Sequence, residues 1–429
     1  MAISKVHSKG LELKPSLTAD RNFYLFPDGF LWGSGITDYE AFGGAESDLP
    51  FRWGPRHAEH YHEDLDLISN TLHHSAFRTA IEWARIEPKE GKIDKDAINF
   101  YHSYLGSIKR TGMKTFVALS DFTNPVWVQE QGGWLSKKVV SKFSQYVELV
   151  SSEFGSYIDY CLIVNDPSSV AQKSYFIGSS PDRGLPPYHN DFTEAMICLG
   201  NLTTAILEGR ETFHKNSKTK VGFGNYYGAF VPLDPKNRRH QDSAYLASQA
   251  LNYHVPDATK NKVDFIGIEY YSKILMAEDN KVARTEVYPQ GIRESVNDYH
   301  KRYNLPLTIL DNGYPTRDDD EKIKFLLEHL MELHNAITQD KLEVLGYNWW
   351  STIHSYTWGY GFKPFFALID VEGREQDVGG YEDLVGSMKR TITKTGQFYG
   401  SICRENGFLK KDYERYHAMK KPLKQWLEF

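Results

Sequence analysis

Short apolar stretches alternate with amphipathic ones along most of the chain. Eight apolar stretches have the length of buried strands, at residues 30–36, 76–80, 115–119, 160–164, 221–226, 264–271, 307–310 and 345–350. Between them, apolar side chains recur at three- or four-residue steps, as in Ile98, Tyr101, Leu105 and Ile108 after the capping residue Asp94. This spacing puts them on one face of a helix. The pattern therefore predicts strands, most of which are followed by a helix.

Further helices are predicted at residues 59–70, 136–154, 191–214, 239–251, 319–335 and 381–398. Residues 168–190 and a polar stretch of about thirty residues after residue 271 are expected to be loops. Strand–helix alternation without a break in composition predicts one parallel α/β domain. Eight such units favour a closed (β/α)8 TIM barrel over a doubly wound sheet. We assign residues 25–429 to the barrel and residues 1–24 to a polar N-terminal arm.

Charge and cysteine content argue against several classes of protein. The net charge is −6 at pH 7, which does not favour binding to nucleic acid or to an anionic membrane. Cys161, Cys198 and Cys403 are odd in number and far apart, so they indicate a reducing compartment rather than a disulfide framework. The N-terminal residues lack the apolar segment of a signal peptide, and no stretch approaches the ~20 apolar residues of a membrane span. We expect a soluble cytoplasmic protein.

The sequence carries no cofactor or metal motif. No G-x-G-x-x-G motif follows the first strand and G-x-x-x-x-G-K-[ST] does not occur, so a nucleotide-binding fold loses its main support. His57, His60 and His62 lie close together, but the two-residue step turns the last one away on a helix. The aromatic share of 14% suits ring stacking in a carbohydrate cleft, although a large core uses the same residues. We expect neither a cofactor nor a metal, and the oligomeric state stays open.

Two predicted strands end in a carboxylate. The strand at 160–164 runs into Asn165 and Asp166, and the strand at 307–310 runs into Asp311. In a (β/α)8 barrel the C-terminal strand ends meet in one pocket. Two carboxyl groups across a sugar ring serve as general acid and nucleophile, or as acid and base. Taken singly, each aspartate is more simply a helix cap or a turn residue, so the hypothesis depends on both lying at the same barrel end.

Other polar and aromatic residues follow strands at the same end. Arg78 in the second strand is placed to hold one aspartate ionised, because a nearby cation lowers the pKa of a carboxylate. The remaining candidates share this position near a strand end and are Glu40, Asp121, Asn225, Glu269, Tyr271, Trp350 and Trp358. We expect these side chains to surround one small-molecule pocket.

An ordered series of short motifs extends from Phe30 to about Leu368. The motifs are Phe30-Leu31-Trp32-Gly33, His60-Tyr61-His62-Glu63-Asp64, Phe77-Arg78, Trp83-Ala84-Arg85-Ile86-Glu87-Pro88, Gly132-Gly133-Trp134-Leu135, Phe265-Ile266-Gly267-Ile268 before Tyr270-Tyr271, and Trp350-Ser351 before Trp358. Together they resemble glycoside hydrolase family 1, the retaining β-glycosidases of clan A. The resemblance implies a carbohydrate or glycoside-like substrate. It also implies supporting roles in catalysis for Arg78, Asn165, Tyr271 and Trp350.

The reacting positions depart from the family pattern. Asp166 matches the acid/base glutamate of the family's Asn-Glu-Pro, and Asp311 matches the nucleophile of its Glu-Asn-Gly. The resemblance therefore implies that Asp166 is the general acid/base and Asp311 the nucleophile or base. Substrate-binding positions also differ, with Glu40 for glutamine, Asp121 for histidine, Phe122 for tryptophan, Glu269 for asparagine and Thr357 for glutamate. The side chains that would contact a glucose-like ring therefore differ from those of the family.

Each change from glutamate to aspartate removes one methylene, about 1.5 Å of reach. Retaining enzymes hold their carboxyls ~5–5.5 Å apart and inverting enzymes ~6.5–9.5 Å, so the anomeric outcome depends on whether the backbone has closed in. Three hypotheses follow: a glycosidase for an unusual or decorated sugar, a biosynthetic enzyme that transfers or rearranges glycosyl groups, and a catalytically silent sugar-binding relative. Under the second hypothesis, the extra acids Glu40, Asp121 and Glu269 indicate a cationic ligand or a different proton inventory. Carboxylates at both reacting positions disfavour the third.

Overall fold

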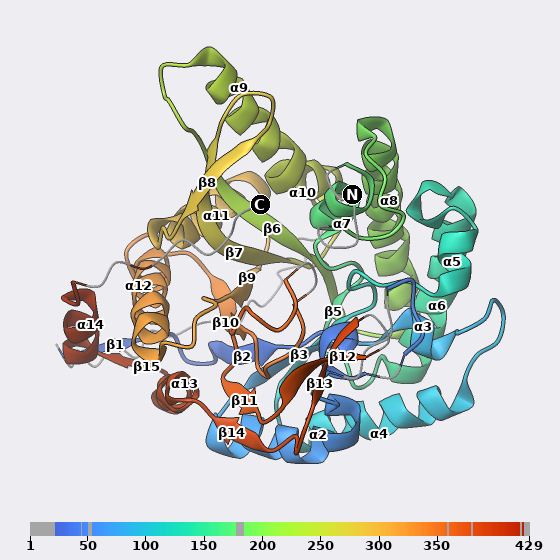
Figure 1. Cartoon of the computed structure of the whole chain (residues 1–429), viewed down its shortest axis with the longest axis horizontal. Helices are drawn as coiled ribbons and strands as arrows, with labels where there is room; N and C mark the ends of the chain where they lie inside the picture. The colour runs from blue at the N-terminus through green and yellow to red at the C-terminus, as the bar shows by residue number, and fades with distance from the viewer. Residues whose placement is uncertain are drawn as a thin grey trace, which may run out of the picture.

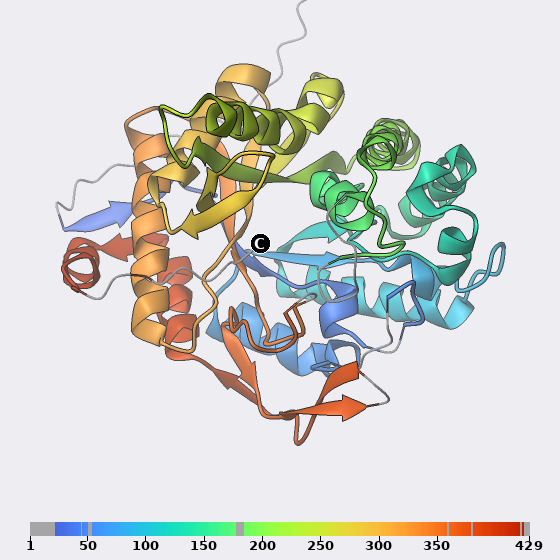
Figure 2. The same cartoon turned by 45° about the horizontal axis from the view of Figure 1, so that its top comes forward.

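The computed structural model describes residues 22–43, 45–49, 54–176, 184–357, 360–378, 381–420 and 423. At its centre is a barrel of parallel strands (Figures 1 and 2). In order around the ring, the strands are β2 (Leu31–Gly35), β3 (Ala76–Ala80), β4 (Lys114–Ala118), β5 (Tyr160–Leu162), β6 (Lys220–Pro232), β7 (Phe265–Met276), β9 (Leu307–Asn312) and β10 (Val344–Trp350). β10 pairs in parallel with β2 and so closes the barrel. The predicted (β/α)8 architecture is confirmed.

Long amphipathic helices surround the strands (Figure 2). They include α2 (His57–Asp66), α4 (Lys95–Thr111), α6 (Lys137–Phe154), α8 (Phe192–Asn216), α11 (Gln290–Tyr303), α12 (Asp319–Thr338) and α13 (Lys394–Glu405). The carboxylate of Asp94 accepts hydrogen bonds from the first N–H groups of α4, and Gly112 ends that helix at φ 83°. Among the described residues, no helix has the length and apolar character needed to cross a membrane.

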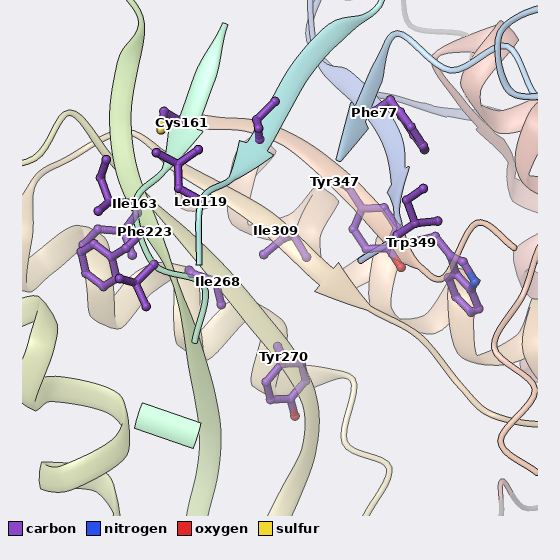
Figure 3. Close-up of a cluster of buried hydrophobic side chains, with 14 of the residues drawn as sticks. Phe77, Leu119, Cys161, Ile163, Phe223, Ile268, Tyr270, Ile309, Tyr347 and Trp349 are labelled. Atoms are coloured by element: carbon purple, nitrogen blue, oxygen red, sulfur yellow. The ribbon is translucent and has the colours of Figure 1, made fainter. Parts of the chain in front are cut away.

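The side chains of the strands alternate between two hydrophobic layers, as strand geometry requires. Phe77 on β3 belongs to the layer between strands and helices, which also contains the strand residues of Figure 3. Ala76 and Ala80, which also belong to β3, face the barrel interior. There the rings of Phe116 and Tyr160 stack with centroids 4.4 Å apart. The interior is thus packed with side chains.

Shorter elements complete the fold. The loop regions after the strands carry α1 (Asp38–Ala41), α3 (Trp83–Ile86), α5 (Val126–Glu130), α7 (Pro167–Tyr175), α9 (Arg238–Ala247) and α10 (His254–Thr259). Two antiparallel pairs follow β10, namely β11 (Ile369–Val371) with β14 (Arg390–Ile392) and β12 (Arg374–Val378) with β13 (Tyr381–Val385). Most of the predicted N-terminal arm lies outside the described residues. β1 (Phe23–Leu25) pairs with β15 (Gly407–Leu409), next to α14 (Lys410–His417).

Three local predictions were wrong. The predicted helix 381–398 is β13, β14 and then α13, which begins only at Lys394 behind the capping side chain of Thr393. The expected loop after residue 271 holds the end of β7, the antiparallel strand β8 (Val282–Glu286) and α11, whose buried residues include Ile292 and Val296. The expected loop 168–190 begins with α7, because Asp166 caps a helix at Pro167.

Candidate active site

A cavity of about 160 Å³ lies at the C-terminal ends of the barrel strands. It is lined by acids, cations, amides, hydroxyls and rings contributed by most of the barrel units: Thr37, Glu40, Arg78, Phe122, Asn165, Asp166, Ser169, Gln172, Lys173, Tyr226, Glu269, Tyr271, Asp311, Trp350, Thr357, Tyr360 and Phe366. Asp166 and Asp311, which are far apart in the sequence, both reach this one cavity.

Arg78 joins two of the acids. Its Nη1 donates to both carboxylate oxygens of Asp311, at 3.1 and 3.0 Å, and its Nη2 donates to Oδ2 of Asp121 at 3.2 Å. The amide nitrogen of Asn165 donates to the other oxygen of Asp121 at 3.1 Å. These side chains are buried, and the Arg78 guanidinium also lies 5.4 Å from the ring centroid of Trp350. The network fixes the orientation of Asp311.

An irregularity in the pairing of β7 with β9 directs the Asp311 side chain into the cavity. Ile268 of β7 pairs with Ile309 of β9, but the next pair is Glu269 with Asp311, so Leu310 is an extra residue on β9. Leu310 packs in the barrel interior, and the following carboxylate would turn outward in a regular strand. The bulge lets Asp311 face the cavity instead, as bulges next to active sites do.

Asp166 stands at the start of α7 with a left-handed backbone, φ 43° and ψ 61°. Its Oδ1 accepts a hydrogen bond from the backbone N–H of Ser169 at 3.1 Å. Phe122, also on the cavity wall, has φ 72°. Non-glycine residues rarely hold this conformation, and such strain concentrates at functional sites. The cap therefore holds the Asp166 side chain at the cavity rather than leaving it free to rotate.

Burial makes both aspartates harder to ionise. Burial raises the pKa of Asp311 to about 7, even though Arg78 opposes the shift, and the charges of Asp121 and Asp166 add to it. Burial also raises the pKa of Asp166, against hydrogen bonds from Ser169 and the charge of Lys173. A carboxyl with a pKa of about 7, next to a second carboxyl whose pKa is also raised, is suited to acid–base work.

Glu269 is a third carboxyl in the same cavity. It is 5% exposed, and burial together with the charges of Asp311 and Asp166 raises its pKa well above the usual range. Lys173, on α7, shows the opposite effect: burial lowers the pKa of its amine to about 8, while Asp166 and Glu40 act to raise it. The cavity therefore contains several groups whose charge depends on their neighbours.

Most predicted site residues meet here. Asp121 does not line the cavity but supports it through Arg78 and Asn165. Asn225 does not reach it either, because its amide nitrogen donates to the carbonyls of Tyr226 and Leu251 and to the Tyr299 hydroxyl. Trp358 lies outside the described residues.

Sequence reasoning did not identify several lining residues. Ser169 and Lys173 follow Asp166 by three and seven positions on α7, which is the spacing of one helix face. Once α7 was recognised, that spacing would have identified them. Tyr226 follows Asn225 directly on β6 and takes the place that Asn225 was predicted to have. Tyr360 and Phe366 come from the segment after β10, in which the sequence pointed to Thr357 and Trp358 but not to these two rings.

The chemistry available to this arrangement is proton transfer combined with nucleophilic or general-base attack. The Asp311 carboxyl forms an ion pair with Arg78, whereas the Asp166 carboxyl caps a helix. Both carboxyls line the same cavity. Among the described residues, no group of three or more His, Cys, Asp or Glu side chains is placed to hold a metal ion. Ring side chains on the wall provide an apolar stacking surface.

Comparison with known proteins places this geometry in a family. The model of glycosyl hydrolase family 1 matches residues 55–259 and 279–408. Beta-glucosidase 24 of Arabidopsis thaliana is 25% identical, over 90% of this chain and 92% of the relative. The galactolipid galactosyltransferase SFR2 of the same plant is 25% identical, over 79% of this chain and 56% of the relative.

A solved structure shares the whole architecture. The beta-glycosidase from Pyrococcus horikoshii superposes with a TM-score of 0.82 and 26% identity, over 93% of this chain and 99% of that protein. The family 1 b-glucosidase from Thermotoga maritima, 22% identical with a TM-score of 0.77, shares the fold. Because the family model covers well over half of the chain and the barrel matches from end to end, this chain belongs to glycosyl hydrolase family 1, a family of glycosidases.

Proposed function

We propose that this protein cleaves a β-glycosidic bond of an unusual or decorated sugar, with Asp166 as general acid/base and Asp311 as nucleophile or base. The observation that carries the proposal is that Asp166 and Asp311 line the same cavity while Arg78 binds both oxygens of Asp311. The arginine favours the ionised form of Asp311, which attack on the anomeric carbon or on water requires.

Asp166 has the complementary role. Burial favours its protonated form, and no arginine is hydrogen-bonded to it among the described residues. As the glycosidic C–O bond breaks, the Asp166 proton passes to the leaving oxygen. If Asp311 bonds to the anomeric carbon as the leaving group departs, a water then displaces Asp311 while Asp166 takes the proton of that water, and the two displacements together give retention. If Asp311 instead takes a proton from a water that attacks the anomeric carbon directly, the single displacement gives inversion. Asn165 and Tyr271 are supporting residues, and Glu40, Phe122, Trp350 and Thr357 lie where they would contact the sugar.

The test is a panel of aryl β-glycosides assayed with the wild type, Asp166→Asn and Asp311→Asn. We expect turnover of at least one glycoside, lost in either variant, and NMR of the first-formed sugar anomer separates retention from inversion. Absence of turnover with every glycoside, together with retained sugar binding, would contradict the proposal and favour a silent binding protein. Asp166→Glu/Asp311→Glu reports whether lengthening both acids restores cleavage of ordinary glucosides.

Glycosyl transfer is a second candidate, supported by the relationship to the Arabidopsis galactosyltransferase. The same two carboxyls serve transfer if an acceptor hydroxyl replaces water in the second step. The measurement is the ratio of transfer product to free sugar when an alcohol or a second sugar is added at increasing concentration. A transfer product that predominates at low millimolar acceptor favours this candidate, and free sugar alone favours hydrolysis.

A further inference from the structure

The cavity contains more acids than cations. The charged side chains on its wall are the carboxyls of Glu40, Asp166, Glu269 and Asp311 and the cations Arg78 and Lys173. Arg78 is hydrogen-bonded to Asp311 and to Asp121, so one guanidinium already serves two acids. Lys173 interacts electrostatically with Asp166 and Glu40, whose charges act to raise the pKa of its amine. Glu269 is left without a hydrogen-bonded cation of its own among the described residues.

The hydrogen bonding of the Glu269 side chain is also incomplete among the described residues. Within the described part of the chain, its Oε1 is buried without a partner, and so is Oδ1 of Asn165. The two oxygens lie over the same glycine, because a Cβ added at Gly224 would be 2.1 Å from Asn165 Oδ1 and 2.8 Å from Glu269 Oε1. Buried acceptors are nearly always paired, and each one left unpaired has an energetic cost. This corner of the cavity therefore needs donors and positive charge.

The charges around Glu269 come from every neighbouring strand unit. The groups are Asp311 on β9, Asp166 before α7, Asp121 after β4, Arg78 on β3, Tyr226 on β6 and Tyr271 on β7. Arg78 lowers the pKa of Glu269, but burial and the charges of Asp311 and Asp166 have larger effects in the opposite direction. In the free enzyme the surroundings of Glu269 therefore oppose ionisation of its carboxyl and raise its pKa.

We propose that the sugar bound here carries a protonated amine and that Glu269 is the carboxylate that receives it. This inference rests on the proposed sugar-binding function of the cavity. A sugar hydroxyl offers a single donor and no charge, whereas an ammonium group offers three donors and the charge that the surrounding acids lack. When the ammonium binds, the Glu269 carboxylic acid releases its proton to solvent, so a carboxylate faces a cation and charge is balanced.

The test compares matched ligands in a binding measurement. The probes are methyl β-glucosides with a single amine at C2, C3, C4 or C6, and the neutral methyl β-glucoside, titrated calorimetrically at pH 6.5. We expect at least one amino glucoside to bind the wild type about tenfold tighter than the neutral parent, as one charge-assisted contact provides. Titrations in two buffers of different ionisation enthalpy should show proton release with that amino glucoside only.

Two variants locate the effect. Glu269→Gln keeps the shape of the side chain and should reduce the preference for the amine to within about twofold, because it removes the charge. Glu148→Gln makes the same change at an exposed position on α6 and should leave the preference unchanged. If Glu269→Gln cannot be obtained folded, the wild-type comparison and the proton release still decide.

Two results would overturn the inference: equal affinity for the neutral and all amino glucosides, or a preference that survives in Glu269→Gln. Neither result depends on turnover. Tight binding of an amino glucoside without cleavage of any glycoside would defeat the proposed hydrolysis and leave this inference standing. Cleavage of neutral glycosides, with no gain from an amine, would do the reverse.

Discussion

Two buried arginine–aspartate groups in this protein behave in opposite ways. In the helical layer, Arg390 of β14 donates to both oxygens of Asp64 in α2, at 2.8 and 3.2 Å, and His57 lies 2.7 Å from the same carboxylate. The remaining donors of Arg390 bind the carbonyls of Met388 and Pro55. At the mouth of the barrel, Arg78 is instead shared between Asp311 and Asp121, and three further carboxyls, those of Glu40, Asp166 and Glu269, lie on the cavity wall.

The titration of the two aspartates reflects this difference. Burial acts to raise the pKa of Asp64, but His57 and Arg390 outweigh it and the pKa is lowered. Burial raises the pKa of Asp311 to about 7 despite Arg78. One acid facing two basic groups gives a permanently charged structural link. Several acids around one cation keep a proton available near neutral pH, which is what acid–base chemistry uses.

Activity should separate the two groups most strongly. Asp311→Asn is expected to lower kcat/KM for the best aryl glycoside by about 1,000-fold or more, because the amide can neither attack nor accept a proton. Asp64→Asn should leave kcat per folded molecule within about threefold, since it lies outside the cavity. An Asp311→Asn enzyme that keeps a tenth of wild-type activity would remove Asp311 from the mechanism.

Stability should respond in the opposite order. Asp64→Asn leaves Arg390 as an uncompensated buried charge and is expected to lower the free energy of unfolding by about 3–5 kcal/mol. Asp311→Asn should not destabilise the protein at pH 8. Burial opposes ionisation of the Asp311 carboxyl, so a neutral amide removes a charge that is unfavourable in the folded state at this pH. Urea denaturation of both variants and the wild type at pH 8 measures this. Equal losses in the two variants would show that Arg78 and Asp311 form a structural pair as well.

The pH dependence of stability sharpens the contrast. The raised pKa of Asp311 means that the folded state binds a proton more tightly than the unfolded state, so its contribution to stability is lost as pH rises from about 4 through about 7. The lowered pKa of Asp64 contributes stability that is lost below about pH 4. In denaturation series from pH 3 to pH 8, Asp311→Asn should flatten the neutral slope and Asp64→Asn the acid slope. If each variant instead changes the other slope, the comparison fails.

The smallest expected effect concerns Lys173. Its charge lowers the pKa of Asp166, so Lys173→Met should move the alkaline limb of the pH–rate profile upward by roughly 0.5–1 unit. At the pH optimum kcat should change by less than about threefold. Gln172→Met, next to it on the cavity wall, is the matched control and should leave the limb in place. An unchanged limb in Lys173→Met would show that Asp166 is not the group that must stay protonated.

The fold could be predicted from local pattern because each barrel unit repeats one strand and one amphipathic helix. The failures lie where pairing partners, not periodicity, decide the structure. β12 and β13 form by pairing with one another. The periodicity of residues 381–398, from which a helix was predicted, contains no information about this pairing. The helix α11 was readable, since Ile292, Val296, Tyr299 and Tyr303 have helical spacing, but the polar character of the segment obscured it.

The site was predictable to the level of which residues meet, and less so in how they are paired. The strand-end rule brought Asp166, Asp311 and Arg78 together because all barrel strands end at one face. It misplaced Asn225, because side chains on one strand alternate and its neighbour Tyr226 faces the cavity. The sharing of Arg78 between Asp311 and Asp121 depends on three-dimensional distances that no sequence motif encodes.

The most direct test of the central claim is a crystal structure of the protein with a non-hydrolysable glycoside analogue in the cavity. The account predicts that the carboxyl groups of Asp166 and Asp311 lie on either side of the anomeric carbon, with Asp166 within hydrogen-bonding distance of the leaving oxygen. The separation of those carboxyls then gives the stereochemistry, about 5–5.5 Å for retention or about 6.5–9.5 Å for inversion. A sugar bound with its anomeric carbon out of reach of either aspartate would contradict it.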